Sequence, residues 1–371
     1  MATRYKEDLK IEVLRGQGEF RAYFKLYDEL FQRGTGNHII EFESPLQRKR
    51  NPIQHEDVTA AVRVLKANNR ITSTAMRVAL RDQTHRNFTP QEFDFIVNLA
   101  VQSMTMIDAN VGDSHGSDFR IGKYRHATWL PEECFVDFVS RCFPQVLAER
   151  RGRVAFVLDK RKSLKAWKLK KRGEITLKGT DNLAEHLLYD PSNRVISLFH
   201  HAEYLRAHLN LWEGIRESKD VGIAAALERG TLSPRLLVET LHSLQSVLFR
   251  YDDDRSMSLL ASLIKKRGFD STCSVPEGYK MFDDTVPEDF QYVYWGERLA
   301  VLYHAVQERP PRTGFQKWLR WQTSESNSFL IAMLALAISI FVGILSLGLS
   351  AVQIWISWQA WQHPVQISTS Q

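Results

Sequence analysis

The sequence predicts a mainly α-helical protein: a helical cytosolic domain with a small α+β element in its middle, and one C-terminal transmembrane helix. Apolar residues recur at helical spacing through most of the chain before residue 310. Short apolar runs bounded by turn residues cluster only at about 150–200. Finally, Phe329 to Trp361 passes 33 residues without Asp, Glu, Lys, Arg or Pro, and about 20 apolar helical residues cross a bilayer.

These observations divide the chain into consecutive regions. We expect a helical region at 1–149, a basic α+β element at 150–200, a second helical region at 201–309, a juxtamembrane linker at 310–328, a transmembrane helix at 329–351, and an interfacial, Trp-rich end with a short tail at 352–371.

The first region reads as a series of amphipathic helices. The clearest start is Thr89-Pro90-Gln91-Glu92, with Thr as N-cap, Pro at the first helical position and Glu three residues after the cap. A helix after Pro131 should bury Phe135, Phe138, Val139 and Cys142. Further helices are predicted at 19–31, 55–68 and 73–81, with irregular segments at 33–55 and 111–128.

The middle of the chain changes pattern. Residues 154–158, 175–177 and 195–199 read as short strands, and Leu183 to Tyr189 reads as a helix closed by the turn at 190–193. Helices resume at 200–216, 236–250 and 295–306, separated by an irregular segment at 268–290.

The apolar run near the C-terminus has two parts. Residues 329–351 are predicted to cross the membrane, whereas Trp355, Trp358 and Trp361 suit the membrane–water interface, where an indole ring is favoured. Arg312, Lys317 and Arg320 precede the run and only His363 follows it.

Because positive residues stay in the cytosol, we expect the large N-terminal part to be cytosolic at an intracellular membrane whose organelle the sequence does not specify. Only ten residues follow Trp361, which is the layout of a tail-anchored protein. The start, MATRYKEDLK, has no apolar signal-peptide core.

Small residues recur every four positions inside the span, at Ala335, Ser339 and Gly343. Such a ridge lets a second helix approach closely. Self-association through the span is one interpretation, and ordinary scatter of small residues is the other.

Basic residues gather in one segment. Residues 150–179 hold twelve Lys or Arg and two acids. Anionic lipid headgroups attract such clusters at about 1 kcal/mol per charge. There are three alternatives: the segment binds nucleic-acid phosphate with Trp167 as a stacking ring, it is a nuclear-localisation signal, or it is a solvated face whose charges pair with acids elsewhere. A neighbouring membrane favours lipid, so we do not expect a nucleic-acid partner. The candidate lipid or phosphate contacts are Lys160, Arg161, Lys162, Lys165, Lys168, Lys170, Lys171 and Arg172.

Motifs for catalysis or metal binding are weak. Gly112 to Gly116 matches GxSxG, but Ser114 follows a predicted helix instead of the strand that a nucleophile elbow needs.

The candidate metal ligands are also weak. His200-His201 lacks a carboxylate or cysteine at i+4 spacing and reads as a surface or half-buried pair. Asp252-Asp253-Asp254 lacks the EF-hand pattern and reads as an exposed turn. Cys134, Cys142 and Cys273 have no CxxC spacing. We therefore predict no enzyme, cofactor or metal.

Three segments carry a resemblance. Trp167 to Arg172 (WKLKKR), Leu183 to Leu187 (LAEHL) and Leu198 to Leu205 (LFHHAEYL), joined to the span ending VQIWISWQAWQHP, resemble uncharacterised single-span, membrane-anchored proteins of filamentous fungi. That family has no assigned activity. CorA-like magnesium transporters also place helices before C-terminal spans, but they have two spans and a Gly-Met-Asn signature, which this chain lacks.

The sequence thus favours a tail-anchored membrane protein with a cytosolic helical domain for binding or scaffolding. A hydrolase using Ser114 and an oligomeric, CorA-like transport protein are the alternatives.

Overall fold

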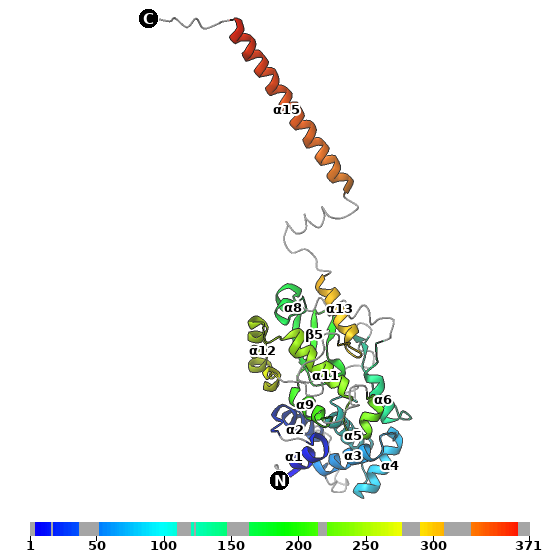
Figure 1. Cartoon of the computed structure of the whole chain (residues 1–371). Helices are drawn as coiled ribbons and strands as arrows, with labels where there is room; N and C mark the ends of the chain where they lie inside the picture. The colour runs from blue at the N-terminus through cyan, green and yellow to red at the C-terminus, as the bar shows by residue number, and fades with distance from the viewer. Residues whose placement is uncertain are drawn as a thin grey trace. The chain divides into compact units, whose positions relative to one another are not determined.

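The computed structural model describes residues 4–15, 18–36, 52–109, 120–121, 124–146, 163–213, 221–276, 290–307 and 328–362 (Figure 1). The chain divides into two compact units, Met1–Gln307 and Glu308–Gln371. The first unit is mainly helical with a small sheet, and the second contains one long apolar helix, which confirms the predicted fold class. The boundaries drawn from the sequence at 149 and 200 fall inside the first unit and stay predictions.

The first unit begins with a layer of helices. α3 packs against α4 and α5, and α2 packs against α5. The elements are α1 (Arg4–Leu9), which continues into a π-helical turn (Lys10–Leu14), α2 (Arg21–Gly36), α3 (His55–Ala67), α4 (Ser73–Thr84) and α5 (Pro90–Thr105).

Local sequence sets where α5 begins. Glu92 N–H donates to the Thr89 hydroxyl at 3.3 Å, and Thr89 N–H donates to the Glu92 carboxylate at 2.8 Å. Pro90 occupies the first helical position, where its missing N–H costs nothing. The predicted capping box is therefore confirmed. α6 (Phe135–Cys142) also buries the four apolar side chains that its spacing predicts.

A mixed three-stranded sheet occupies the middle of the unit. β3 (Thr176–Thr180) pairs in parallel with β5 (Val195–Phe199), and β4 (Leu188–Asp190) pairs antiparallel with the other edge of β5. A separate short ladder joins β1 (Arg120–Ile121) to β2 (Tyr124–Arg125), inside a segment predicted to be irregular. The strand predicted at 154–158 lies outside the described residues.

One helix prediction is wrong. Residues 183–189 form a short 3₁₀ turn at Leu183–Glu185 and then enter β4 instead of continuing as a helix. Leu188 lies opposite Ser197 in β5, so sheet pairing decides this conformation over local helical preference.

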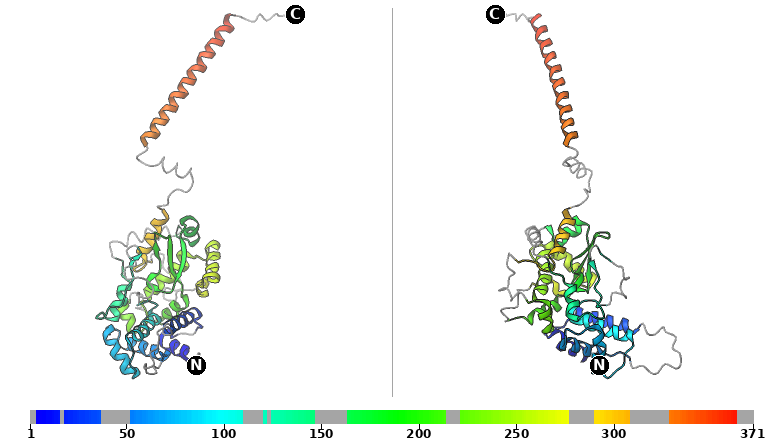
Figure 2. Two further views of the ribbon diagram at one scale, coloured as in Figure 1. Left: turned by 180° about the vertical axis from the view of Figure 1, so that it is seen from behind. Right: turned by 90° about the vertical axis from the view of Figure 1, so that its right-hand side faces the viewer.

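Helices complete the first unit around the sheet. α8 contacts β3, and α13 contacts β4 and α8 (Figure 2). These elements are α8 (Ala166–Gly173), α9 (Ala202–Asn210), α10 (Ile223–Glu228), α11 (Pro234–His242), which continues into a π-helical turn (Ser243–Leu248), α12 (Asp254–Arg267), a 3₁₀ turn (Ser271–Ser274) and α13 (Gly296–Gln307).

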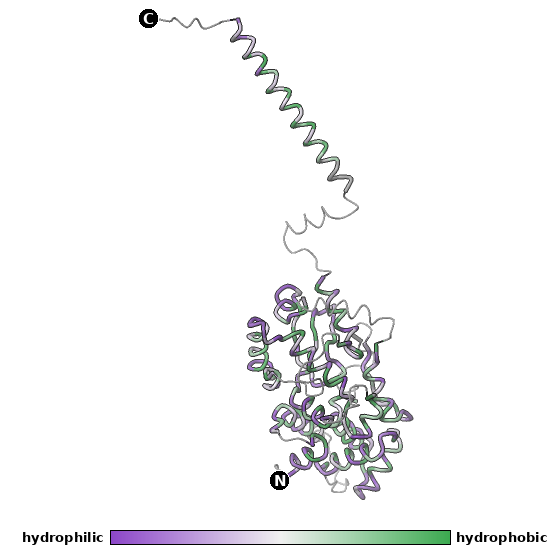
Figure 3. The backbone as a smooth tube through the Cα atoms, in the orientation of Figure 1, coloured by the Kyte–Doolittle hydropathy of each residue, from purple (hydrophilic) through white to green (hydrophobic). Residues whose placement is uncertain are grey.

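The second unit contains α15 (Ser328–Gln362). Its 35 residues span about 52 Å at the usual helical rise. The part Ala335–Gln359 is long and apolar enough to cross a membrane (Figure 3). Its most apolar stretch of 18 residues has a mean hydropathy of 2.3, and none of that stretch is buried. The helix runs without a break through residues 351 and 352, so the division between a crossing and an interfacial part stays a prediction.

Candidate functional site

Two neighbouring parallel strands end beside each other and bring three polar side chains together. Thr180, the last residue of β3, lies opposite Phe199, the last residue of β5. Asp181 follows β3 directly, and His200 and His201 follow β5. In parallel sheets, ligand sites form outside the carboxyl ends of the strands, so this edge is the candidate functional site.

The three side chains converge on one carboxylate oxygen. His201 Nε2 lies 2.7 Å from Asp181 Oδ1, and His200 Nε2 lies 3.5 Å from the same oxygen. The two imidazole rings stack, with centroids 4.6 Å apart and planes 23° apart. One ligand atom from each residue lies within 4.8 Å of the other two.

Burial differs sharply across this cluster. The side chains of His200 and His201 are 9% and 2% exposed, whereas that of Asp181 is 47% exposed. The histidines are therefore buried, and the predicted surface or half-buried pair is wrong. The cluster has a buried imidazole side and a carboxylate side that meets solvent.

Electrostatics keep Asp181 ionised. Burial opposes ionisation, but the hydrogen bond from His201 and the charges of His201, His200 and Arg33 together hold the pKa of Asp181 below its ordinary value. Burial lowers the pKa of His200 to about 4, helped by His201 and opposed by Asp181 and Asp270. At neutral pH the site thus contains a carboxylate beside a neutral imidazole of His200.

Neighbouring residues hold His200 in place. The ring of Phe269 stacks on it at 4.8 Å, Asp270 N–H donates to His200 Nδ1 at 3.4 Å, and the Cys273 thiol donates to the His200 carbonyl at 3.0 Å. A surface groove of about 430 Å³ is lined in part by Phe269 and Asp270. It therefore runs past the residues that support His200.

Sequence reasoning missed this cluster because it sought a carboxylate or cysteine four residues from the histidines. The carboxylate instead comes from Asp181, at the end of the adjacent strand β3. The available signal was positional: His200 comes directly after the strand predicted at 195–199, and Asp181 comes four residues after the strand predicted at 175–177.

The basic segment is described only in part. Lys160, Arg161 and Lys162 lie outside the described residues. Lys165 Nζ lies 3.0 Å from Asp253 Oδ1, so its charge has a partner. The remaining candidates, Lys168, Lys170, Lys171 and Arg172, are on α8, where the last three are exposed.

An aromatic ring organises the cations of α8. The Lys168 ammonium and the Arg172 guanidinium lie 5.8 and 5.6 Å from the ring centre of Trp167. Arg255 of α12 approaches the same ring at 5.0 Å. Cation–π contacts therefore fix part of this basic surface against the fold.

Two other candidates from the sequence are Ser114 and the acidic triplet Asp252-Asp253-Asp254. Ser114 lies outside the described residues. In the acidic triplet, Asp252 accepts from Arg250, and Asp253 caps α12 by accepting from Ser256 N–H at 3.2 Å. This triplet serves local structure.

On α15, the small residues Ala335, Ser339 and Gly343 lie on one face, and helical geometry adds Ser346, Ser350 and Gln353 to it. The sequence reading missed these three. Trp355, Trp358 and Trp361 are exposed near the end of the same helix.

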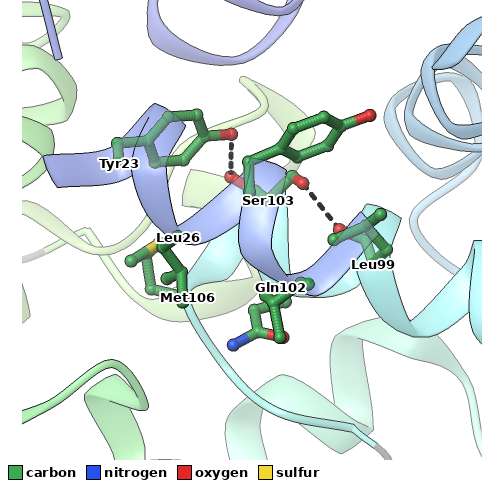
Figure 4. Close-up of a pocket in the computed structure, with 8 residues that line it drawn as sticks. Tyr23, Leu26, Leu99, Gln102, Ser103 and Met106 are labelled. Carbon is green, nitrogen blue, oxygen red and sulfur yellow. Dashed lines mark hydrogen bonds between the residues drawn. The ribbon is translucent and has the colours of Figure 1, made fainter. Parts of the chain in front are cut away.

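A small internal cavity lies between α2 and α5 (Figure 4). Tyr23 OH donates to the Ser103 carbonyl at 3.1 Å across it. Its volume of about 10 Å³ admits roughly one water molecule, so it is not a ligand site.

Comparison of the chain with protein-family models, curated proteins and solved structures finds no match.

Proposed function

We propose that this chain is a membrane-anchored protein whose first unit faces the cytosol and binds partners or anionic lipid at the membrane surface. The observation that carries the proposal is α15. It continues for 35 residues, and the most apolar stretch within Ala335–Gln359 is entirely exposed. A core helix of a soluble protein would bury such a surface, so a bilayer is the environment that suits it.

Flanking charge supports the orientation. Arg312, Lys317 and Arg320 precede α15, and only His363 follows it. By the positive-inside rule, Met1–Gln307 then faces the cytosol. Protease treatment of intact organelles containing the tagged protein tests this: an N-terminal tag should be digested and a C-terminal tag protected. The opposite pattern contradicts the proposed orientation.

The basic face of α8 supports lipid contact. Lys170, Lys171 and Arg172 are exposed on it, and α8 packs against α13, which ends at Gln307. The chain continues from that residue through 308–327 to α15. The basic face of α8 thus packs against α13, and the chain leads from the end of α13 to the membrane helix α15.

Liposome binding tests the role of α8. A chain ending at Gln322, which retains the first unit but not the span, should bind vesicles containing anionic lipid. Replacing Lys170, Lys171 and Arg172 with Ala should weaken binding about 100-fold, since each charge contributes about 1 kcal/mol.

A matched control comes from α12. Its last turn has an equally charged, exposed triplet, Lys265, Lys266 and Arg267. Replacing these with Ala should weaken binding much less. Equal losses from both triplets would show that only net charge matters and would remove α8 from the proposal.

The small-residue face of α15 supports self-association. Ala335, Ser339 and Gly343 allow close backbone approach, and Gln353 on the same face offers an amide that a second helix can satisfy within the membrane. A second copy of α15 would present the same small residues and the same Gln353 amide, at matching positions along the helix.

A further inference from the structure

We propose that Asp181, His200 and His201 form a binding site for a divalent transition-metal ion, and that Zn²⁺ suits this ligand set. This role is separate from membrane anchoring. Two imidazole nitrogens and a carboxylate oxygen are ordinary zinc ligands, and imidazole also accepts Fe²⁺, Co²⁺ and Ni²⁺.

The backbone brings the ligands together before any ion binds. Asp181 and His200 follow hydrogen-bonded parallel strands whose last residues, Thr180 and Phe199, are in register. Bringing ligands from distant parts of a chain together costs conformational entropy. Here the pairing of β3 with β5 already holds the ligands close together in the folded chain, so metal binding does not add this entropy cost.

The two distances that involve Asp181 require only small adjustments. Zinc lies about 2.0–2.2 Å from nitrogen and oxygen ligands, so neighbouring tetrahedral ligand atoms are about 3.3 Å apart. Asp181 Oδ1 is 2.7 Å from His201 Nε2 and 3.5 Å from His200 Nε2. The first pair must open and the second must close slightly. The stacked rings must also turn, because a metal ion lies in the plane of each imidazole that binds it.

Proton positions must change on binding. In the metal-free arrangement Nε2–H of His201 donates to Asp181, whereas a metal needs the Nε2 lone pair. The proton can move to Nδ1, a buried atom with no hydrogen-bond partner among the described residues. For His200 the same shift gives up the long 3.4 Å hydrogen bond from Asp270 N–H to Nδ1 and would leave two N–H groups facing each other, so this ring must turn away from Asp270 when a metal binds. The short hydrogen bond that the two changes break is the 2.7 Å bond between His201 and Asp181.

Three protein ligands leave one position open. Structural zinc sites are closed by four protein ligands, whereas three ligands leave a place for water or another small ligand. The half-exposed side chain of Asp181 lies at the solvent-facing side of the cluster. The ion should therefore bind with water as its remaining ligand.

The test uses the full chain in detergent after treatment with a chelator and removal of the chelator. Zn²⁺ alone is titrated calorimetrically, and Co²⁺ alone is titrated by visible absorption, which reports four- or five-coordinate nitrogen and oxygen ligation. We expect one ion per chain for each metal. Asp181→Asn should weaken binding at least about tenfold, because it replaces the charged ligand at a half-exposed position where folding tolerates the change.

His304→Ala is the matched control, because His304 is an exposed histidine on α13 remote in sequence from the cluster. Its binding should equal that of the unchanged chain. Two outcomes overturn the proposal: no Co²⁺ absorption band with the unchanged chain, or equal affinity for the unchanged chain and Asp181→Asn. Either would leave the three residues as a hydrogen-bonded link between strand ends. The Co²⁺ measurement on the unchanged chain decides the question even where a variant folds poorly.

Discussion

The carboxylate of Glu239 accepts a hydrogen bond of 3.0 Å from the backbone N–H of Trp295, the residue just before α13. The same carboxylate accepts from the N–H groups of Val293 and Tyr294 at 2.5 and 2.8 Å. One buried side chain of α11 thus satisfies three successive backbone donors. It ties the central helices to α13, after which the chain continues toward the membrane helix.

Removing this carboxylate should destabilise the first unit severely. Glu239→Ala leaves the N–H groups of buried Tyr294 and Trp295, and of half-buried Val293, without this acceptor, and each unsatisfied buried donor costs about 1–3 kcal/mol. We expect the free energy of unfolding to fall by more than about 3 kcal/mol, measured by urea denaturation of the chain ending at Gln322. The control Glu228→Ala removes an exposed carboxylate of α10 and should change stability by less than about 0.5 kcal/mol. Similar values for the two variants would contradict this role of Glu239.

Glu239 should also make stability depend on pH. Burial raises its pKa to about 7, against the opposing effects of the three backbone donors and Arg235. The folded state therefore keeps a proton that the unfolded state loses near pH 4.5. This stabilising contribution is complete below about pH 4.5 and disappears as the pH rises to about 7. Relative to Glu239→Gln, the unfolding free energy should fall over that interval by up to about 3 kcal/mol. A pH-independent difference would show that this pKa is not raised.

His208 should have the opposite pH dependence. It is buried, its Nδ1 lies 3.0 Å from Thr231 Oγ1, and burial, with smaller effects from Arg15 and Lys66, lowers its pKa to about 3. The unfolded state binds a proton near pH 6.5, so stability is complete above that pH and is lost below it. Compared with His208→Gln, the unchanged chain should lose about 1.4 kcal/mol per pH unit between pH 6.5 and 4. Parallel stability curves for the two proteins would contradict this.

The ion pair between Lys165 and Asp253 separates stability from lipid binding. Asp253 also caps α12, so Asp253→Ala should cost about 1–2 kcal/mol, whereas Lys165→Ala should cost less than about 1 kcal/mol. Because Asp253 already neutralises Lys165, Lys165→Ala should leave binding to anionic vesicles nearly unchanged. A loss as large as that of the α8 triplet variant would show that Lys165 contacts lipid. Asp254→Ala, next to the cap and exposed, is the control for stability.

Gly343 provides the test of self-association through α15. Gly343→Leu places a large side chain on the face shared with Ala335 and Ser339 and should weaken association in vesicles at least about tenfold, measured by energy transfer between labelled chains. Gly348→Leu adds the same side chain five residues later, about 140° around the helix. Neither position meets another atom within 4 Å of an added Cβ, so neither change distorts the helix itself. Equal effects of the two variants would argue against a specific face.

Features coded by neighbouring residues were predictable. The capping box of Thr89 and Glu92 depends on atoms three residues apart, and β5 has the bounds that its apolar run predicts. The buried stripe of α6 follows from helical spacing alone. Features that depend on a distant partner were not predictable in this way. Residues 188–190 form a strand because their backbone groups pair with the edge of β5, and the local sequence does not indicate this pairing.

The sequence by itself determined the helical class, the long apolar helix α15 and the concentration of positive charge before Gly173, because each depends on local spacing or composition. Only the tertiary structure decided which of these charges have partners and which side chains meet. Lys165 pairs with Asp253, which caps α12, and Asp181 meets His200 and His201. The physical reason is that strand pairing and helix packing join residues far apart in the chain, and the spacing of residues along the sequence does not specify those contacts.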